Sequence, residues 1–176
     1  MRCSRPPLNT IWGYFAVFFM AVGIAQATVL PPVVSPSSLP NLTLPDMAGR
    51  LVGLKSLEGK LLIVSLWANW CPFCHQEALG LVRLHKQFDS KVRFVGIAID
   101  NKESAERFIL EEKVNYLTLL AEPHPGHVLT ALGDRRGMLP YTILVLPSGR
   151  IVSRHIGYYA EKTLRHSIDR VLEKSH

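Results

Sequence analysis

Cysteine is scarce in this chain of 176 residues, which contains three, at positions 3, 71 and 74. No second Cys pair and no nearby Cys/His pair completes a set of four ligands around Cys71 and Cys74, which argues against a structural zinc site. Two cysteines this close together should form a disulfide with each other in an oxidising compartment, and such a disulfide does not cross-link distant parts of a fold. We therefore expect no bound metal.

Clusters of like charge interleaved with aromatic residues are also lacking. The 20 Lys and Arg residues exceed the 14 Asp and Glu residues, and the formal net charge is +6. These basic residues are scattered among acidic ones, whereas a nucleic-acid interface gathers them on one face. The composition predicts a mildly basic surface and no nucleic-acid partner, and no internal repeat is visible.

Residues 1–27 have the pattern of an export signal. Two arginines and no acidic residue precede an apolar stretch over 11–25, and Ala25-Gln26-Ala27 fits a small-x-small cleavage site. We expect cleavage before Thr28 and a periplasmic or other extracytoplasmic location. The alternative is an uncleaved membrane anchor, for which the apolar stretch is on the short side. Cys3 precedes this stretch and is therefore not a lipid-attachment cysteine.

The remainder of the chain divides into a linker and one domain. Residues 28–41 are rich in proline and serine, as linkers often are. Residues 42–176 are enough for one domain with a hydrophobic core of its own.

Apolar periodicity within this domain alternates between strands and helices. The segment 92–99 is apolar almost throughout, which is typical of a central strand covered on both faces. Residues 147–150 (Pro-Ser-Gly-Arg) predict the turn of a hairpin. The pattern predicts strands at 61–66, 92–99, 116–120, 141–146 and 151–156, and helices at 71–88, 104–112, 127–132 and 160–173.

The Cys-x-x-Cys pair directly follows the strand predicted at 61–66. If Cys71 opens a helix, Cys71 and Cys74 lie on one helical face, at a separation that a disulfide tolerates. The unpaired N–H groups at the helix N-terminus would favour the thiolate of Cys71, which is the attacking species. Pro72 suits the first helical turn, since its missing N–H needs no partner there. The segment predicts a dithiol/disulfide redox site.

Several segments together resemble the TlpA/ResA/DsbE-like group of exported thiol-disulfide oxidoreductases. The resemblance covers roughly residues 40 to 173. It is carried by Leu44-Pro45-Asp46, by 52–60, by Trp-Ala-Asn-Trp-Cys-Pro-Phe-Cys at 67–74 and by Gly-Met-Leu-Pro-Tyr-Thr at 137–142. It implies an α/β thioredoxin fold, with a mixed central sheet flanked by helices, an N-terminal hairpin and an inserted αβ element at 104–120.

The resemblance also implies the chemistry. Cys71 is the expected nucleophile and Cys74 the resolving thiol of a protein-disulfide reductase, with their disulfide as the redox group and no other cofactor. The expected partners are exported proteins with disulfides or dithiols and a membrane electron donor of the DsbD type. We expect a monomer.

Three further residues are expected to bind substrate. Pro140 matches the family's cis-proline, and a proline there leaves the backbone of Leu139 available to pair with an extended substrate peptide. Trp70, next to the nucleophile, offers an apolar surface to a docking polypeptide. Trp67 is expected to lie in the core.

The route of the proton on Cys74 is less obvious. Ser65 stands where thioredoxins proper carry a buried aspartate, and Tyr141 stands where several family members place a glutamate. The remaining candidates are water, Glu77 and Lys60, although Glu77 has the alternative role of complementing the helix N-terminus. Both departures count against the cytochrome-c-maturation branch, which nevertheless stays open. Leu79 is a third departure, since the family often has a helix-kinking proline there.

Histidines near the site have simple interpretations. His75 is expected to be an exposed helical residue, with electrostatic tuning of Cys71 as the alternative. His124 and His127 lie in a Pro/Gly-rich segment without a third ligand, which favours a solvated loop over a metal site.

Other functions remain as alternatives. A copper-binding or copper-delivery protein would use the same thiols, but such relatives have a wider Cys spacing and a distant histidine. A peroxidase on this fold needs a Thr-x-x-Cys site, which 67–74 does not contain. A disulfide oxidase or isomerase is the third alternative, although there is no room for the helical domain of DsbA-type oxidases. Phe73 supplies no charge to the Cys71 thiolate and therefore predicts an intermediate redox potential.

Overall fold

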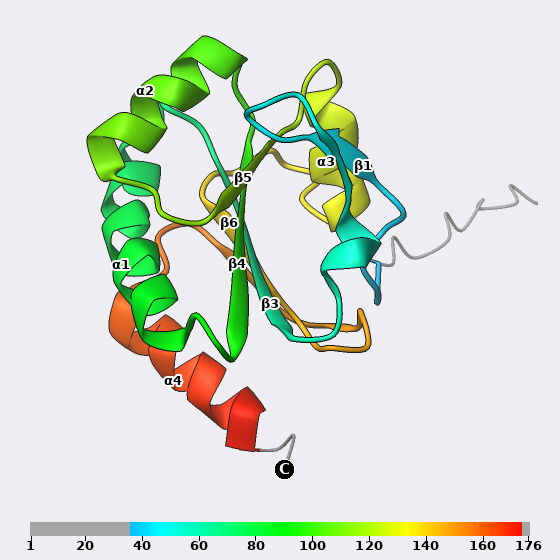
Figure 1. The fold of residues 1–176 in the computed structure, drawn as a ribbon, viewed down its shortest axis with the longest axis vertical. Coiled ribbons are helices and arrows are strands. Elements are labelled where there is room, and N and C mark those ends of the chain that lie inside the picture. Colours follow the sequence, from blue (N-terminus) through cyan, green and yellow to red (C-terminus); the bar gives the residue numbers. More distant parts are fainter. Residues whose placement is uncertain (1–35, 174–176) are drawn as a thin grey trace, which may run out of the picture. The chain divides into compact units, whose positions relative to one another are not determined.

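A five-stranded mixed sheet forms the centre of the protein in the computed structural model, which describes residues 36–173 (Figure 1). The strand order is β5-β4-β3-β6-β7. The strands are β3 (Leu61–Trp67), β4 (Val92–Ala98), β5 (Leu117–Leu120), β6 (Tyr141–Val145) and β7 (Ile151–Ile156).

Strand β3 is the central strand and leads directly to the Cys pair. It pairs in parallel with β4, which in turn pairs in parallel with β5, and it pairs antiparallel with β6 on its other side. All seven of its residues are buried. The register places Ser65 opposite Gly96 on one side and opposite Thr142 on the other.

Helices and the N-terminal hairpin cover the two faces of this sheet. On one face lie α1 (Pro72–Phe88), α2 (Lys102–Glu112) and α4 (Glu161–Glu173). On the other face lie α3 (Pro125–Leu132), the hairpin of β1 (Thr43–Pro45) and β2 (Leu51–Gly53), and the 3-10 helix η1 (Leu54–Leu57) (Figure 1). The predicted thioredoxin fold, with its N-terminal hairpin and its inserted helix and strand, is confirmed.

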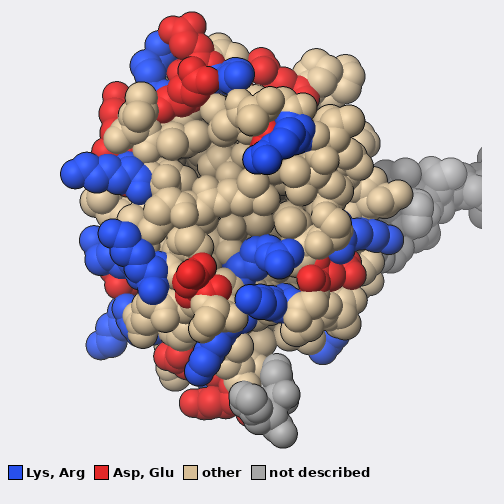
Figure 2. Space-filling model, in the orientation of Figure 1, with Lys and Arg blue, Asp and Glu red and all other residues tan. Residues whose placement is uncertain are grey.

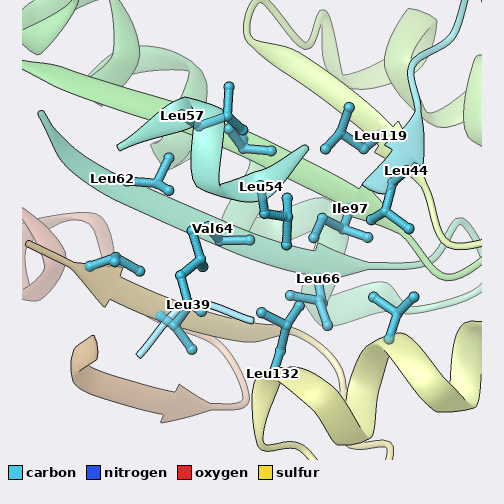
Figure 3. Close-up of a cluster of buried hydrophobic side chains, with 14 of the residues drawn as sticks. Leu39, Leu44, Leu54, Leu57, Leu62, Val64, Leu66, Ile97, Leu119 and Leu132 are labelled. Carbon is cyan, nitrogen blue, oxygen red and sulfur yellow. The ribbon is translucent and has the colours of Figure 1, made fainter. Parts of the chain in front are cut away.

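The side chains of β3 alternate between two cores because successive residues of a strand point to opposite faces. Leu62, Val64 and Leu66 belong to the core beneath α3 and the hairpin, which Figure 3 shows. Leu61 and Ile63 belong to the core beneath α1 and α4. Trp67 continues the second face toward α2, where it meets Phe108 in a third cluster that also contains both cysteines.

The prediction of a linker over 28–41 is wrong for the residues that the structure describes. Leu39 is 1% exposed and points into the core of Figure 3. Ser38 pairs with Arg150, and the Leu39 N–H donates to the Gly149 carbonyl at 2.8 Å. The buried Leu39 side chain and these backbone pairings dock the segment on the domain. The expected export signal at 1–27, with Cys3, lies outside the described residues.

Two helices begin earlier than apolar spacing indicated. α2 begins at Lys102, because the Asn101 side chain accepts the Ser104 N–H and caps it. α3 begins at Pro125, a residue type that suits a first helical position.

Within residues 36–173, no helix is long and apolar enough to cross a membrane. The face in Figure 2 shows Lys and Arg side chains interspersed with Asp and Glu.

Candidate active site

Cys71 and Cys74 form a disulfide at the start of α1. Their Cα atoms are 5.2 Å apart, within the range that disulfides span. Cys71 is the N-cap residue, with extended backbone, and Pro72 is the first residue of the helix. The Cys74 N–H donates to the Cys71 Sγ at 3.3 Å. Both cysteines are buried, with 4% and 2% of their surfaces exposed.

This geometry favours a thiolate on Cys71 rather than on Cys74. The Sγ of Cys71 faces the positive end of the helix dipole and already accepts one of its unpaired N–H groups. The same groups would stabilise a negative charge on that sulfur after reduction and so lower the pKa of its thiol.

Exposed apolar side chains lie next to the pair in sequence and in the fold. Trp70 is 66% exposed, Phe73 56% and Met138 48%. Leu139 packs against the cluster that contains both cysteines. Large apolar side chains left exposed in this way are typical of an interaction surface rather than of a core.

The loop before β6 lies beside the disulfide. Tyr141 pairs with Leu66, so the residues that precede β6 lie next to those that follow β3. The Leu139–Pro140 peptide bond is cis, as the family resemblance implied. The Pro140 carbonyl accepts the Gly157 N–H at 2.8 Å. Among the described residues, the backbone of Leu139 has no hydrogen-bond partner.

Glu77 does not complement the helix N-terminus, because it lies beyond the first turn and is only 2% exposed. Its Oε1 accepts the Ser65 hydroxyl at 3.1 Å and the Thr142 hydroxyl at 2.6 Å. Its Oε2 accepts the Tyr159 N–H at 2.8 Å. Burial raises the pKa of Glu77, and these hydrogen bonds oppose the rise.

Ser65 and Tyr141 have different environments, although both stand where relatives carry acids. Ser65 points to the α1 face and is a hydrogen-bond donor to Glu77. The carboxylate of this site therefore comes from the helix, and the strand supplies the hydroxyl. Tyr141 points to the opposite face, where its buried hydroxyl donates to the Leu132 carbonyl at 3.1 Å.

Lys60 is not brought to the site. It immediately precedes β3, whereas Cys71 follows the other end of this strand. Seven extended residues span roughly 20 Å. Lys60 is also exposed, beside a surface hollow lined by His85 and Asp89. The expectation that Lys60 transfers a proton to Cys74 is therefore wrong for direct transfer.

His75 is not an exposed helical side chain as expected. Its Nδ1 lies 2.7 Å from Glu112 Oε1, and its Nε2 lies 2.8 Å from the Asn69 carbonyl oxygen. The ring also contacts Phe108, with the ring centroids 4.7 Å apart. Sequence reasoning missed Glu112, which lies 37 positions away and carries no motif.

Trp67 is buried, as predicted. It is 2% exposed and stacks on Phe108, with the ring centroids 4.0 Å apart.

His124 is the N-cap residue of α3, and His127 lies in its first turn. In the part of the chain that the structure describes, no group of three or more His, Cys, Asp or Glu side chains is placed to hold a metal ion.

Disulfide exchange is the chemistry expected of a bonded Cys-x-x-Cys pair at a helix N-terminus on this fold, so the class is that of the thioredoxin-fold thiol-disulfide oxidoreductases. The chain belongs to the AhpC/TSA family, whose model matches residues 37–154. Ala68 stands three residues before Cys71, where a Thr-x-x-Cys peroxidatic site needs threonine.

Curated relatives agree with this class. The chain is 27% identical over 124 residues to the thiol-disulfide oxidoreductase ResA of Halalkalibacterium halodurans, which covers 69% of this chain and 68% of ResA. It is 27% identical over 158 residues to the thiol:disulfide interchange protein DsbE of Vibrio cholerae, and the match covers 84% of this chain and 78% of DsbE. The enzyme is thus a thiol-disulfide oxidoreductase of the ResA/DsbE type.

Solved structures show the same fold. The thioredoxin domain of a thiol-disulfide oxidoreductase from Bacteroides vulgatus has a TM-score of 0.67 and 25% identity, covering 79% of this chain and 98% of that one. A thiol:disulfide interchange protein of the thioredoxin family from Chlorobium tepidum also has a TM-score of 0.67, with 22% identity. The match covers 78% of this chain and 97% of that one.

Proposed function

We propose that the protein reduces disulfides of exported proteins. The observation that carries this proposal is the position of the Cys71 sulfur, at a helix N-cap and hydrogen-bonded by the Cys74 N–H, next to exposed apolar side chains. Support for export comes from the sequence of residues 1–27 and from the similarity to DsbE.

The reaction begins with the reduced protein. The Cys71 thiolate attacks one sulfur of a substrate disulfide, the substrate S–S bond breaks, and the leaving sulfur takes up a proton. Cys74 then loses its proton and attacks the Cys71 sulfur. This step forms the Cys71–Cys74 disulfide and releases the second substrate sulfur as a thiolate. The two electrons that the substrate gains must be replaced by a dithiol donor, for which we propose a membrane protein of the DsbD type.

Glu77 is the proposed acceptor of the Cys74 proton. It follows Cys74 by three helical positions, and such side chains are neighbours on a helix surface. The hydroxyls of Ser65 and Thr142 can each donate or accept a hydrogen bond. The buried site therefore accommodates Glu77 both as a carboxylate and as a carboxylic acid, which a proton acceptor requires.

The substrate is proposed to bind as an extended peptide beside the disulfide. The backbone of Leu139 offers a donor and an acceptor without partners among the described residues, and the ring of Pro140 has no N–H that would compete. The exposed ring of Trp70, the residue before Cys71, supplies apolar surface for the same peptide. This mode of binding selects for an accessible, extended disulfide rather than for one particular sequence.

Trapping of the mixed disulfide tests the mechanism. Cys74→Ser removes the resolving thiol, so we expect a reduced Cys74→Ser protein to accumulate covalent adducts with a disulfide-bonded test protein such as insulin. Cys71→Ser is the matched control and should form none. Non-reducing electrophoresis with mass spectrometry identifies the linked cysteine. Adducts through Cys74, or normal insulin reduction by Cys71→Ser, would contradict the proposal.

A further inference from the structure

The ring of His75 meets hydrogen-bond acceptors at both of its nitrogens. These are the Glu112 carboxylate at Nδ1 and the Asn69 carbonyl at Nε2. A neutral imidazole carries one N–H and can donate only one hydrogen bond, whereas an imidazolium donates two. The geometry around His75 is therefore that of an imidazolium.

The backbone just before Cys71 is held from both sides. The Asn69 N–H donates to Asp100 Oδ2 at 2.7 Å, and the Asn69 carbonyl is the acceptor for His75. Asp100 lies two residues after the end of β4, and His75 belongs to α1. The loop that carries the nucleophile is thus fixed to two elements of the fold, two residues before the reacting sulfur.

Helix α2 reaches the same loop through two side chains. Glu112, at its end, binds His75, and Phe108, one turn earlier, contacts the His75 ring and stacks on Trp67. Figure 1 shows α2 packed alongside the first part of α1. α2 lies in the inserted αβ element at 104–120, so the insertion contributes to the redox site.

We propose that His75 is a positioning residue for the disulfide exchange. As an imidazolium between Glu112 and Asn69, it holds the loop before Cys71 in place and directs positive charge toward the start of α1. His75 and Cys71 are four positions apart and lie on the same side of the helix, where the backbone N–H of His75 donates to the backbone carbonyl of Cys71 at 3.4 Å. Loss of the ring proton breaks one of its two hydrogen bonds, which makes the reactivity of Cys71 depend on pH.

The charges around the ring favour the protonated form. Burial lowers the pKa of His75, but its bonds to the Asn69 carbonyl and to Glu112, together with the charges of Glu112 and Glu111, outweigh burial. The net shift is upward from the ordinary value of 6.5. Asp100 accepts the Asn69 N–H on the other side of this loop. On His75's own helix, the titratable groups nearest to it in sequence are the thiols of Cys71 and Cys74 and the carboxyl group of Glu77.

Two measurements on the reduced protein test this role, which rests on the proposed dithiol mechanism but needs no protein substrate. The first is the pH dependence of Cys71 alkylation by iodoacetamide, followed by mass spectrometry. His75→Gln keeps a donor for Asn69 but removes the charge. A nearby opposite charge commonly shifts a pKa by one unit or more, and by less where solvent screens the charge. At a pH below the thiol pKa, Cys71 in His75→Gln should therefore be alkylated roughly three- to tenfold more slowly than in the wild type.

The second measurement is the titration of the His75 ring by NMR. Glu112→Gln should lower its midpoint, while Glu111→Gln, which removes the same charge from the next residue without breaking a hydrogen bond, should change it less. Circular dichroism establishes that each variant is folded, and Glu112→Gln tests the contact from the α2 side if His75→Gln does not fold. An unchanged alkylation profile in a folded His75→Gln, or equal midpoints for Glu112→Gln and Glu111→Gln, would overturn the proposal. If the alkylation rate and the His75 midpoint change as expected but the wild-type protein does not reduce insulin, the result would count against the proposed function alone.

Discussion

The Glu77 side chain is buried and accepts hydrogen bonds from three donors, so its removal should be costly. Glu77→Ala leaves the Ser65 and Thr142 hydroxyls and the Tyr159 N–H without this acceptor, and it also opens a cavity. We expect a loss of about 2–5 kcal/mol in the free energy of unfolding. Urea denaturation of the oxidised protein measures it. The exposed Glu106→Ala is the control and should change stability by less than about 0.5 kcal/mol.

The cost of Glu77→Ala should depend on pH. Because burial raises the pKa of Glu77 above the ordinary 4.5, the folded protein keeps a proton that the unfolded chain releases. The contribution of this group is fully present below pH 4.5 and is lost as pH rises through the raised pKa. The gap in stability between wild type and Glu77→Ala should therefore be wider at pH 4.5 than at pH 8. A gap that widened toward pH 8 would mean that Glu77 is held as a carboxylate.

Also at the residue scale, the sequence predicts the bonded Cys pair and the cis-proline well and their surroundings poorly. Cys71, Cys74 and Pro140 were found because each belongs to a short local pattern. The partners of Glu77 lie 12, 65 and 82 positions away along the chain, in β3, in β6 and before α4. A side chain's partners are set by the packing of elements, which periodicity does not contain.

At the scale of elements, β4 approaches Trp67 closely at Gly96. A Cβ added at Gly96 would lie 2.6 Å from Trp67 Nε1 and 3.2 Å from the Tyr116 ring. Trp67 cannot move freely because it stacks on Phe108. Gly96→Ala should therefore cost about 1–3 kcal/mol of stability, the usual price of overpacking.

Thermal or urea unfolding checks this expectation against Gly126→Ala in the first turn of α3. A Cβ added at Gly126 meets no atom within 4 Å, so that variant should be neutral or slightly stabilising. If Gly96→Ala were as stable as wild type, the stack of Trp67 on Phe108 would be looser than described.

The boundaries of elements show what apolar spacing misses. Strand β7 begins and ends where predicted, since alternation and a Pro-Ser-Gly-Arg turn both mark it. The starts of α2 and α3 depend on a polar cap and on a proline, neither of which contributes to apolar periodicity. The docked segment around Leu39 was missed for a related reason, because composition averages over a single buried side chain.

For the molecule as a whole, the redox potential decides the direction of electron flow. The helix N-terminus favours a thiolate at Cys71 in the reduced protein, and the exposed Phe73 adds no charge. We expect a potential of about −180 to −250 mV, between those of the strong oxidase DsbA and of thioredoxin. Equilibration with glutathione buffers, followed by thiol labelling, measures it. A value near about −120 mV would favour an oxidase and contradict the reductase proposal.

Strand β3, buried along its whole length and paired on both sides, also determines how the protein opens. We expect the amide hydrogens of this strand to exchange with solvent mainly through unfolding of the entire domain, because a local opening would have to separate β3 from two neighbouring strands at once. The redox pair follows this strand after three loop residues. We therefore expect each catalytic cycle to take place beside the most slowly exchanging part of the sheet, and turnover to leave that part closed.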